Sequence, residues 1–137
     1  IHGGVDDVWF NKDTEELVVV DYKAQSNSNP VETQSYLESK YHQGYKRQMD
    51  IYVYILRQMG FKVSDLTYFM VCNGEKDYDK FDAKINFTIT LVPYQSDSSW
   101  IPAKIKDMKK VLDSKTPPNH NIDCEKCIYL ESYGSIK

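Results

Sequence analysis

Two apolar segments near the start of the chain are separated by a short polar stretch. Residues 5–10 and 16–23 are rich in apolar side chains, and the second segment contains the β-branched run 18–20. β-Branched residues favour strands, and the polar residues at 11–15 are typical of a turn. The pattern therefore predicts a β-hairpin.

The rest of the chain switches between helical and strand patterns. Apolar residues recur every three or four positions in two segments, which is typical of helices, and form short runs or alternate in two others, which is typical of strands. The predicted elements are a loop at 25–35, a helix at 37–59, strands at 66–72 and 84–92 with a turn at 73–74, and a helix at 100–112. The order β-β-α-β-β-α predicts a mixed α/β (α+β) fold with a central β-sheet flanked by helices.

Composition narrows the class of protein. A chain of 137 residues with 41% hydrophobic residues can form one domain with a core, so a disordered chain is excluded. No stretch approaches the roughly 18 apolar residues of a membrane span. Three cysteines do not indicate a secreted disulfide framework. We therefore expect a cytoplasmic protein without membrane contact. We interpret residues 1–137 as one domain, a fragment of a longer chain in which the N-terminal elements of the domain are missing.

Charge is unevenly distributed although the net charge is only −3. Residues 1–39 carry eight acidic residues and two lysines, whereas residues 40–62 carry five basic residues and one Asp. The overall balance argues against a simple polycation that coats nucleic acid. The acidic segment is followed by a basic helix, so we look for function in individual carboxylates rather than in the net charge.

Asp21 and Lys23 end the second predicted strand. Residues two apart on a strand project to the same side, so this carboxylate and ammonium lie together. Buried charges are costly unless they are paired or used, and an ion pair at a strand end is the simplest interpretation. Asp6 and Asp7 interrupt the preceding strand, and pairing across the 11–15 turn would bring one of them near Asp21. Two facing carboxylates repel each other unless a cation lies between them, and carboxylate oxygens suit Mg²⁺.

Gln48 lies on the apolar face of the predicted helix at 37–59. A glutamine in that position needs hydrogen-bond partners, and Tyr52 is four residues further on the same face. The pair can present an amide and a phenol toward the carboxylates. The alternative is a satisfied core glutamine beside a packed tyrosine. Tyr41, Tyr45 and Tyr54 are interpreted as core or boundary aromatics rather than as platforms on which bases stack.

Three short segments have the forms G-x-x-D, D-x-K and Q-x-x-x-Y, in this order. They are Gly3-Gly4-Val5-Asp6, Val18-Val19-Val20-Asp21-Tyr22-Lys23 and Gln48-Met49-Asp50-Ile51-Tyr52. Order and spacing resemble the RecB-like nuclease domains of the PD-(D/E)XK nuclease superfamily. The resemblance covers residues 3–60 by motif and implies a restriction-endonuclease-like core.

The resemblance also implies a divalent metal, Mg²⁺ or Mn²⁺. Asp6 would be the first ligand, with Asp7 as the alternative, and Asp21 would be the second. The backbone carbonyl of Tyr22 would be a further ligand.

The remaining motif residues would act around that metal. Lys23 would position the attacking water and stabilise charge on the scissile phosphate, and Gln48 and Tyr52 would orient the site. Lys46, Arg47 and Lys104 are candidates to guide the nucleic-acid backbone. Ordinary solvated helix faces are the alternative for these three basic residues.

The tail contains Cys124-x-x-Cys127. Iron–sulfur members of the RecB-like branch close their domain with a cysteine cluster, so this resembles part of one. Two thiolates fall short of the four usual for zinc or a cluster, so neither is expected from this chain alone.

The resemblance thus implies a metal-dependent deoxyribonuclease that hydrolyses phosphodiester bonds, as an exonuclease or an endonuclease. Recombination, repair and phage or defence DNA processing are the expected settings, with DNA and further domains or subunits as partners. A catalytically inactive module that binds nucleic acid or protein is the alternative function, and a purely structural α+β domain is a third.

Overall fold

The computed structural model describes residues 2–77, 83–116 and 118–134. The chain divides into two compact units, Ile1–Ile101 and Pro102–Lys137. The organisation as one domain stays a prediction. Among the described residues, no helix has the length and apolar character needed to cross a membrane.

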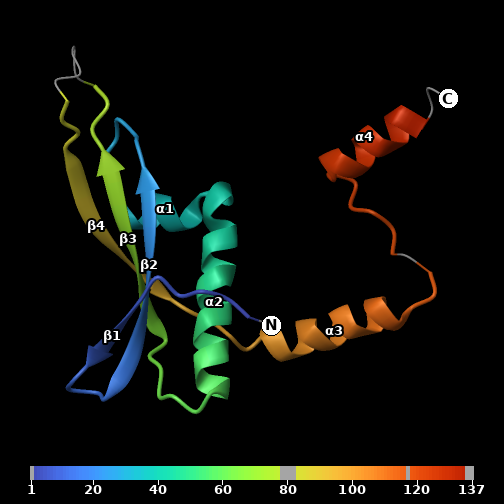
Figure 1. Cartoon of the computed structure of the whole chain (residues 1–137), viewed down its shortest axis with the longest axis horizontal. Helices are drawn as coiled ribbons and strands as arrows, with labels where there is room; N and C mark the ends of the chain where they lie inside the picture. The colour runs from blue at the N-terminus through green and yellow to red at the C-terminus, as the bar shows by residue number, and fades with distance from the viewer. Residues whose placement is uncertain (1, 78–82, 117, 135–137) are drawn as a thin grey trace. The chain divides into compact units, whose positions relative to one another are not determined.

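The first unit is built on a four-stranded mixed β-sheet with the order β1-β2-β3-β4 (Figure 1). Its strands are β1 (Asp7–Asn11), β2 (Glu16–Gln25), β3 (Leu66–Gly74) and β4 (Phe87–Gln95). β1 and β2 form the predicted antiparallel hairpin, β2 and β3 are parallel, and β3 and β4 are antiparallel. The predicted mixed sheet is confirmed, and its centre is the parallel pair β2–β3.

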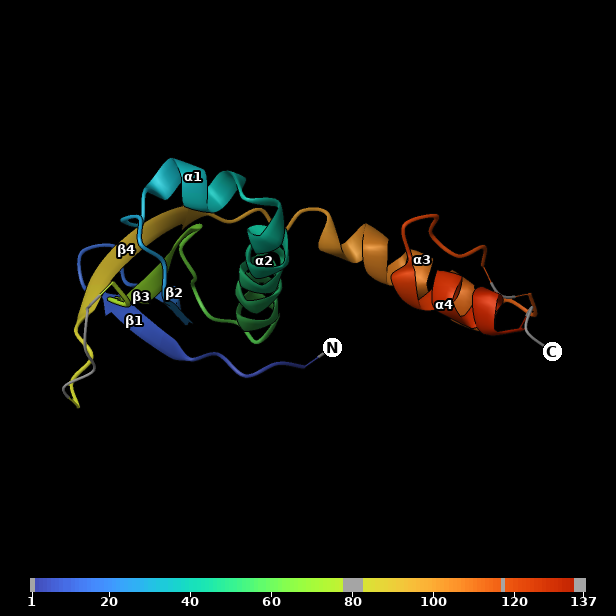
Figure 2. The ribbon, with the colours of Figure 1, turned by 90° about the horizontal axis from the view of Figure 1, so that it is seen from above.

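Helices connect the two parallel strands and cover one face of the sheet (Figures 1 and 2). They are α1 (Thr33–Glu38), the 3₁₀ turn η1 (Lys40–His42) and α2 (Gln43–Gln58). α2 buries Met49 and Val53 completely against Val19 and Phe69 of the sheet. Burial of these apolar side chains holds α2 across β2, close to where Asp21 and Lys23 lie.

The single helix predicted at 37–59 is wrong at its start. Ser39 leaves the helical region with φ −55° and ψ 128°, and its Oγ accepts a hydrogen bond from the Tyr41 amide at 3.3 Å. Serine competes for backbone hydrogen bonds in this way, so it ends α1 and begins η1. The loop predicted at 25–35 is correspondingly shorter, because α1 begins at Thr33.

The turn predicted at Asn73 and Gly74 is wrong. These two residues continue β3 and pair with Thr88 and Phe87 of β4. The Asn73 side chain donates to the Asn27 carbonyl and accepts from the Asn27 amide, at 2.8 and 2.9 Å. These long-range hydrogen bonds override the local turn preference of Asn-Gly.

The face of β4 that points away from the helices is apolar and exposed. Phe87, Ile89 and Leu91 share that face, as their alternation predicts, and they are 57, 61 and 45% exposed. α1 and α2 pack on the other face, where Val92 lies.

The second unit contains most of α3 (Ile101–Asp113) and all of α4 (Glu125–Gly134). α3 is the predicted helix, whereas α4 was not predicted. Ile101, the first residue of α3, is buried in the first unit.

Asp50 is a buried carboxylate that ties α2 to the segment after β4. It is 5% exposed, and its two oxygens accept hydrogen bonds from Tyr94 Oη, the Asp97 amide and Trp100 Nε1, each at 3.0 Å. Burial raises the pKa of the Tyr94 phenol, and the hydrogen bond to Asp50 raises it further. The phenol therefore stays protonated and donates to Asp50. Asp50 thus satisfies three donors in a region with little access to water.

Asp50→Ala is expected to lower the free energy of unfolding by about 3 kcal/mol, because it leaves buried donors without an acceptor. Urea denaturation followed by circular dichroism measures this loss. Asp65→Ala is the matched control, since Asp65 is 55% exposed and its ion pair with Arg57 is worth at most about 1 kcal/mol. Equal destabilisation by the two variants would contradict the role of Asp50.

Candidate active site

Strand β2 places Asp21 and Lys23 on the face of the sheet that the helices cover. Val19, two residues before Asp21, lies in the core on the same face. The Asp21 side chain is 1% exposed and forms an ion pair with Lys23 Nζ, whose side chain is 18% exposed. The apolar run before Asp21 therefore carries this carboxylate into the interior, and Lys23 lies at the edge of that interior.

The environment of Asp21 disfavours its charge. Burial raises the pKa of this carboxyl, the Lys23 ammonium opposes the rise, and the neighbouring Asp6 carboxylate adds to it. Asp21 Oδ2 contacts the ammonium as an ion pair, but among the described residues it accepts no well-directed hydrogen bond. A buried anionic oxygen thus retains the capacity to accept a further cation or donor.

The structure brings Asp6, and not Asp7, to Asp21. Asp7 pairs with Val20, so Asp6 falls opposite Asp21 when the register continues. Asp6 Oδ2 accepts a hydrogen bond from the Tyr22 amide at 2.8 Å. This contact holds the Asp6 carboxylate at the backbone of the residue between Asp21 and Lys23.

Asp7 is committed to other partners. Its carboxylate accepts hydrogen bonds from the Val8 amide at 2.8 Å, from Trp9 Nε1 at 3.0 Å and from Tyr22 Oη at 2.5 Å. The Tyr22 phenol, followed by the Trp9 indole, lowers the pKa of this carboxyl. Of the two candidate ligands, Asp6 therefore has the geometry that a site shared with Asp21 requires.

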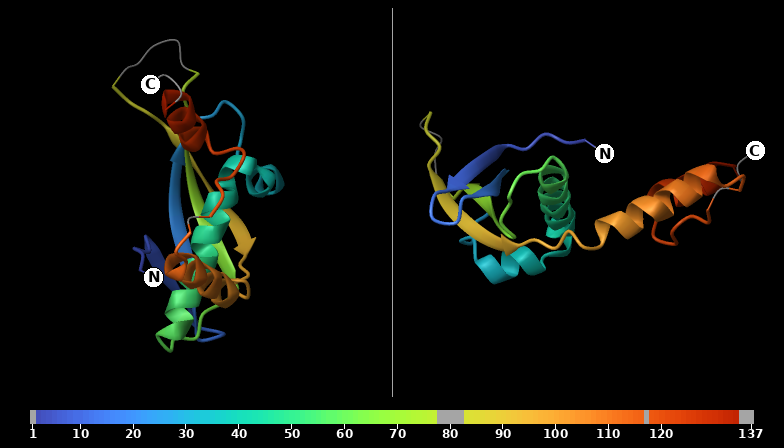
Figure 3. Two further views of the ribbon diagram at one scale, coloured as in Figure 1. Left: turned by 90° about the vertical axis from the view of Figure 1, so that its right-hand side faces the viewer. Right: turned by 90° about the horizontal axis from the view of Figure 1, so that it is seen from below.

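Gln48 and Tyr52 join the same cluster from α2. Lys23 Nζ donates to Gln48 Oε1 at 3.4 Å, and Gln48 Nε2 donates to Tyr52 Oη at 2.6 Å. The segment before β1 runs past α2 (Figures 2 and 3), and a Cβ at Gly3 would lie 2.9 Å from Tyr52 Cε1. Only glycine permits this approach without a shift of the ring. The three motif segments therefore meet around Lys23.

Tyr45 packs against the hydrophobic core, as its interpretation as a core or boundary aromatic predicts, whereas that interpretation is wrong for Tyr41, which is 78% exposed. Tyr45 also contacts Lys23, which the sequence analysis did not predict. Lys23 Nζ lies 4.5 Å from the centroid of the Tyr45 ring. The available signal was the spacing of Tyr45 three residues before Gln48, which places both on one face of a helix.

The three candidate basic residues are not brought into this cluster by any contact that the structure describes. Lys46 lies two residues before Gln48, and successive turns of about 100° per residue direct the two side chains to opposite sides of α2. Arg47 is exposed on α2, and Lys104 is exposed on α3 in the second unit. Their role in guiding nucleic acid stays a prediction.

Cys124 and Cys127 lie at the start of α4, where the Cys127 amide donates to Cys124 Sγ at 3.3 Å. The Cys127 thiol lowers the pKa of Cys124, and Cys124 raises the pKa of Cys127. All three cysteines are free thiols. Over the described parts of the chain, no three or more His, Cys, Asp or Glu side chains form a group that could hold a metal ion.

The residues around Asp21 nevertheless fit Mg²⁺ or Mn²⁺. Magnesium usually binds one or two carboxylates and completes its shell with water and substrate phosphate, so it does not need three acidic side chains. Asp6 and Asp21 supply two carboxylates, and the buried Oδ2 of Asp21 has unused acceptor capacity. The Tyr22 carbonyl is a candidate for a further oxygen ligand.

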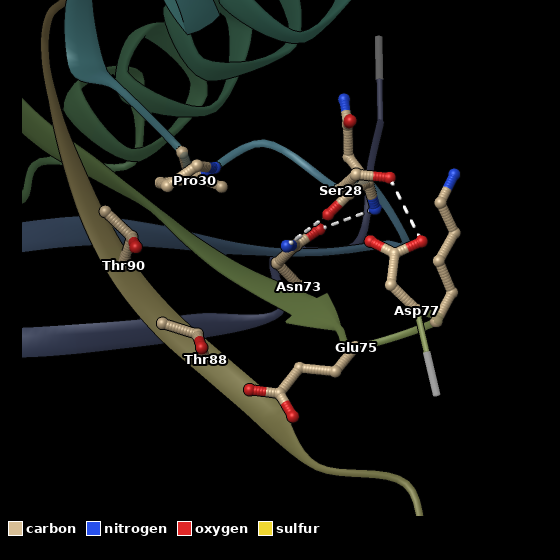
Figure 4. A pocket seen from close by; sticks show the side chains of 10 residues that line it. Ser28, Pro30, Asn73, Glu75, Asp77, Thr88 and Thr90 are labelled. Carbon is tan, nitrogen blue, oxygen red and sulfur yellow. Dashed lines mark hydrogen bonds between the residues drawn. The ribbon is translucent and has the colours of Figure 1, made fainter. Parts of the chain in front are cut away.

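A separate cavity of about 430 Å³ lies at the ends of β2, β3 and β4 (Figure 4). Asn73, Thr88 and Thr90 line it from the sheet, and Ser28 lines it from the loop after β2, where its Oγ donates to Asp77 Oδ1 at 3.3 Å. Asp21 and Lys23 are not among its lining residues. The sequence did not predict this cavity, because the loop that forms it is held by the long-range Asn27–Asn73 hydrogen bonds.

Comparison with known proteins identifies the family. No curated protein and no solved structure matches this chain. Residues 1–132, nearly the whole chain, match the family described as the PD-(D/E)XK nuclease superfamily. The mixed sheet flanked by helices agrees with the restriction-endonuclease-like fold of that family. The chain therefore belongs to the PD-(D/E)XK nuclease superfamily.

Proposed function

We propose that this protein is a metal-dependent nuclease that hydrolyses phosphodiester bonds of DNA. The observation that carries the proposal is the buried Asp21 carboxylate, which lies beside Asp6 and forms an ion pair with Lys23. Two carboxylates that can hold a cation, with an ammonium beside them, are a set of groups suited to hydrolysis of a phosphodiester.

In this proposal Asp6 and Asp21 hold the metal, and the Tyr22 carbonyl is a third ligand. When bound, a divalent cation supplies positive charge that attracts the phosphate and activates water. Lys23 places a second positive charge beside the reacting phosphate, where negative charge develops in the transition state. Gln48 holds the Lys23 ammonium through Oε1 and is itself held by Tyr52.

A binding module without catalysis on the same fold is the second candidate. A site that had lost catalysis would be expected to lose a ligand or the lysine, whereas Asp6, Asp21 and Lys23 are all present and close together here. Magnesium-dependent formation of shortened products separates the two functions. The proposal includes the assignment to the RecB-like branch. The enzyme would act as an exonuclease or as an endonuclease.

The matched pair Asp6→Asn and Asp7→Asn tests the proposed ligand set. We expect Asp6→Asn to lose at least about 100-fold in cleavage rate, because it removes a metal ligand. Asp7→Asn is expected to retain cleavage, because the Asp7 carboxylate is bound to Trp9 and Tyr22 Oη.

The assay uses end-labelled single-stranded DNA, duplex DNA and RNA of one sequence, each with Mg²⁺, Mn²⁺ or EDTA. Cleavage of the DNA substrates that needs the metal supports the proposal, and preferential cleavage of RNA would correct the substrate. Loss of cleavage in Asp7→Asn but not in Asp6→Asn would reverse the ligand assignment. No cleavage of any substrate by the wild-type protein would favour the binding module.

A further inference from the structure

The Lys23 ammonium has a third contact that the proposed roles of Asp21 and Gln48 do not explain. Its Nζ lies 4.5 Å from the centroid of the Tyr45 ring. The face of an aromatic ring attracts a cation, and the attraction grows when the cation is shielded from water. The Lys23 side chain is only 18% exposed, so this contact operates in a partly desolvated site.

The Tyr45 ring is fixed by other aromatic groups. His42 stacks on it with ring centroids 5.2 Å apart and an interplanar angle of 18°, and Phe69 lies against it at 6.5 Å. His42 is held in turn by Tyr36, because its Nδ1 donates to the Tyr36 carbonyl oxygen at 2.7 Å. Phe69 is fully buried in the core. The ring is therefore anchored to the hydrophobic core.

The other two contacts of the ammonium are less dependable during the reaction. The Asp21 carboxylate is shared with the metal in the proposed function, so a bound cation competes with Lys23 for its negative charge. The Gln48 hydrogen bond is long, at 3.4 Å. The Tyr45 ring carries no charge and binds no metal, so its attraction for the ammonium persists when Asp21 is occupied.

We propose that Tyr45 is a positioning residue, which holds the Lys23 ammonium beside the scissile phosphate through the face of its ring. The inference rests on the proposed nuclease function and adds a requirement to it: position 45 needs an aromatic ring, whereas the phenolic hydroxyl is dispensable.

Two substitutions distinguish the effect of the aromatic ring face from the effect of side-chain volume. Tyr45→Leu keeps an apolar side chain but removes the ring face, and we expect kcat to fall about 10-fold with little change in KM. Tyr45→Phe keeps the ring and should recover most of that loss. Tyr54→Leu is the matched control, because Tyr54 lies nine residues further on α2, which at about 100° per residue is the opposite side of the helix. Urea denaturation checks that each variant folds.

A readout that needs no catalysis accompanies the kinetics. In the metal-free protein, the ring current of Tyr45 should shift the NMR signals of the Lys23 ε-methylene protons upfield, and Lys23→Met assigns those signals. The shift should persist in Tyr45→Phe and disappear in Tyr45→Leu. An unshifted Lys23 signal in the wild type, or equal kcat values for Leu and Tyr at position 45, would overturn the inference while the nuclease function stands. Absence of cleavage by the wild type would overturn the proposed function and the catalytic part of this inference together, and the NMR shift would still report whether the contact exists.

Discussion

Replacing Asp21 with Asn is expected to abolish metal-dependent cleavage, with a loss of at least about 100-fold in rate. Asn keeps the shape of the side chain but loses the negative charge that a divalent cation needs. Asp21 is 1% exposed, and the carboxylate beside it is that of Asp6, which the account already uses as the other ligand. No further carboxylate in the described site can therefore replace Asp21. A cleavage assay with end-labelled DNA in Mg²⁺ and in Mn²⁺ measures the loss.

The same variant should fold at least as well as the wild type. Burial raises the pKa of Asp21 above its ordinary value of 3.8, so the ionised carboxylate costs stability in the metal-free protein. The stability that the protonated group contributes is fully present below that ordinary value and is lost as pH rises through the raised pKa. Urea midpoints from about pH 4 to pH 7 should therefore fall in this range more in the wild type than in Asp21→Asn. A variant that cleaves normally, or one that fails to fold, would contradict this account of Asp21.

Replacing Lys23 with Met is expected to lower cleavage by about 100- to 1000-fold, because it removes a preorganised positive charge from the reacting phosphate. Unlike Asp21→Asn, this variant keeps both carboxylates and should still bind Mn²⁺. The combination of retained metal binding and lost cleavage distinguishes a lysine that acts on the substrate from one that only neutralises Asp21.

Lys62→Met is the matched control for this substitution. Lys62 is 66% exposed, and its Nζ donates to the Thr14 carbonyl oxygen at 2.7 Å and lies 3.9 Å from Glu16 Oε1, so its charge is solvated and has partners outside the site. Its cleavage rate should equal that of the wild type. If Lys23→Met and Lys62→Met cleave equally well, Lys23 has only a structural role in the ion pair.

Much of the fold follows from local patterns. The apolar runs and alternation predict all four strands, although β4 (Phe87–Gln95) begins and ends three residues later than the predicted strand at 84–92. The helical spacing of Tyr45, Gln48 and Tyr52 predicts α2. The position of Asp21 and Lys23 on one side of β2 follows from the two-residue period of a strand. These features depend on near neighbours in the sequence, so the sequence alone predicts them.

The features that the sequence did not predict depend on distant partners. The choice between Asp6 and Asp7 needs the register of β1 and the hydrogen bonds of Trp9 and Tyr22, which lie on different strands. The extension of β3 through Asn73 depends on the long-range hydrogen bonds with Asn27. The break at Ser39 is the exception, because it is a local choice set by the hydrogen bond from the Tyr41 amide to Ser39 Oγ. The contact between Tyr45 and Lys23 joins α2 to β2 and needs the packing of the helix on the sheet.

The most direct test of the central claim is a calorimetric titration of Mn²⁺ into the wild-type protein and into Asp21→Asn, followed by a DNA cleavage assay in the same buffers. The account predicts that the wild type binds Mn²⁺ and cleaves, and that Asp21→Asn does neither while remaining folded. Equal Mn²⁺ binding and equal cleavage by the two proteins would contradict the claim that Asp21 is at the centre of a nuclease active site.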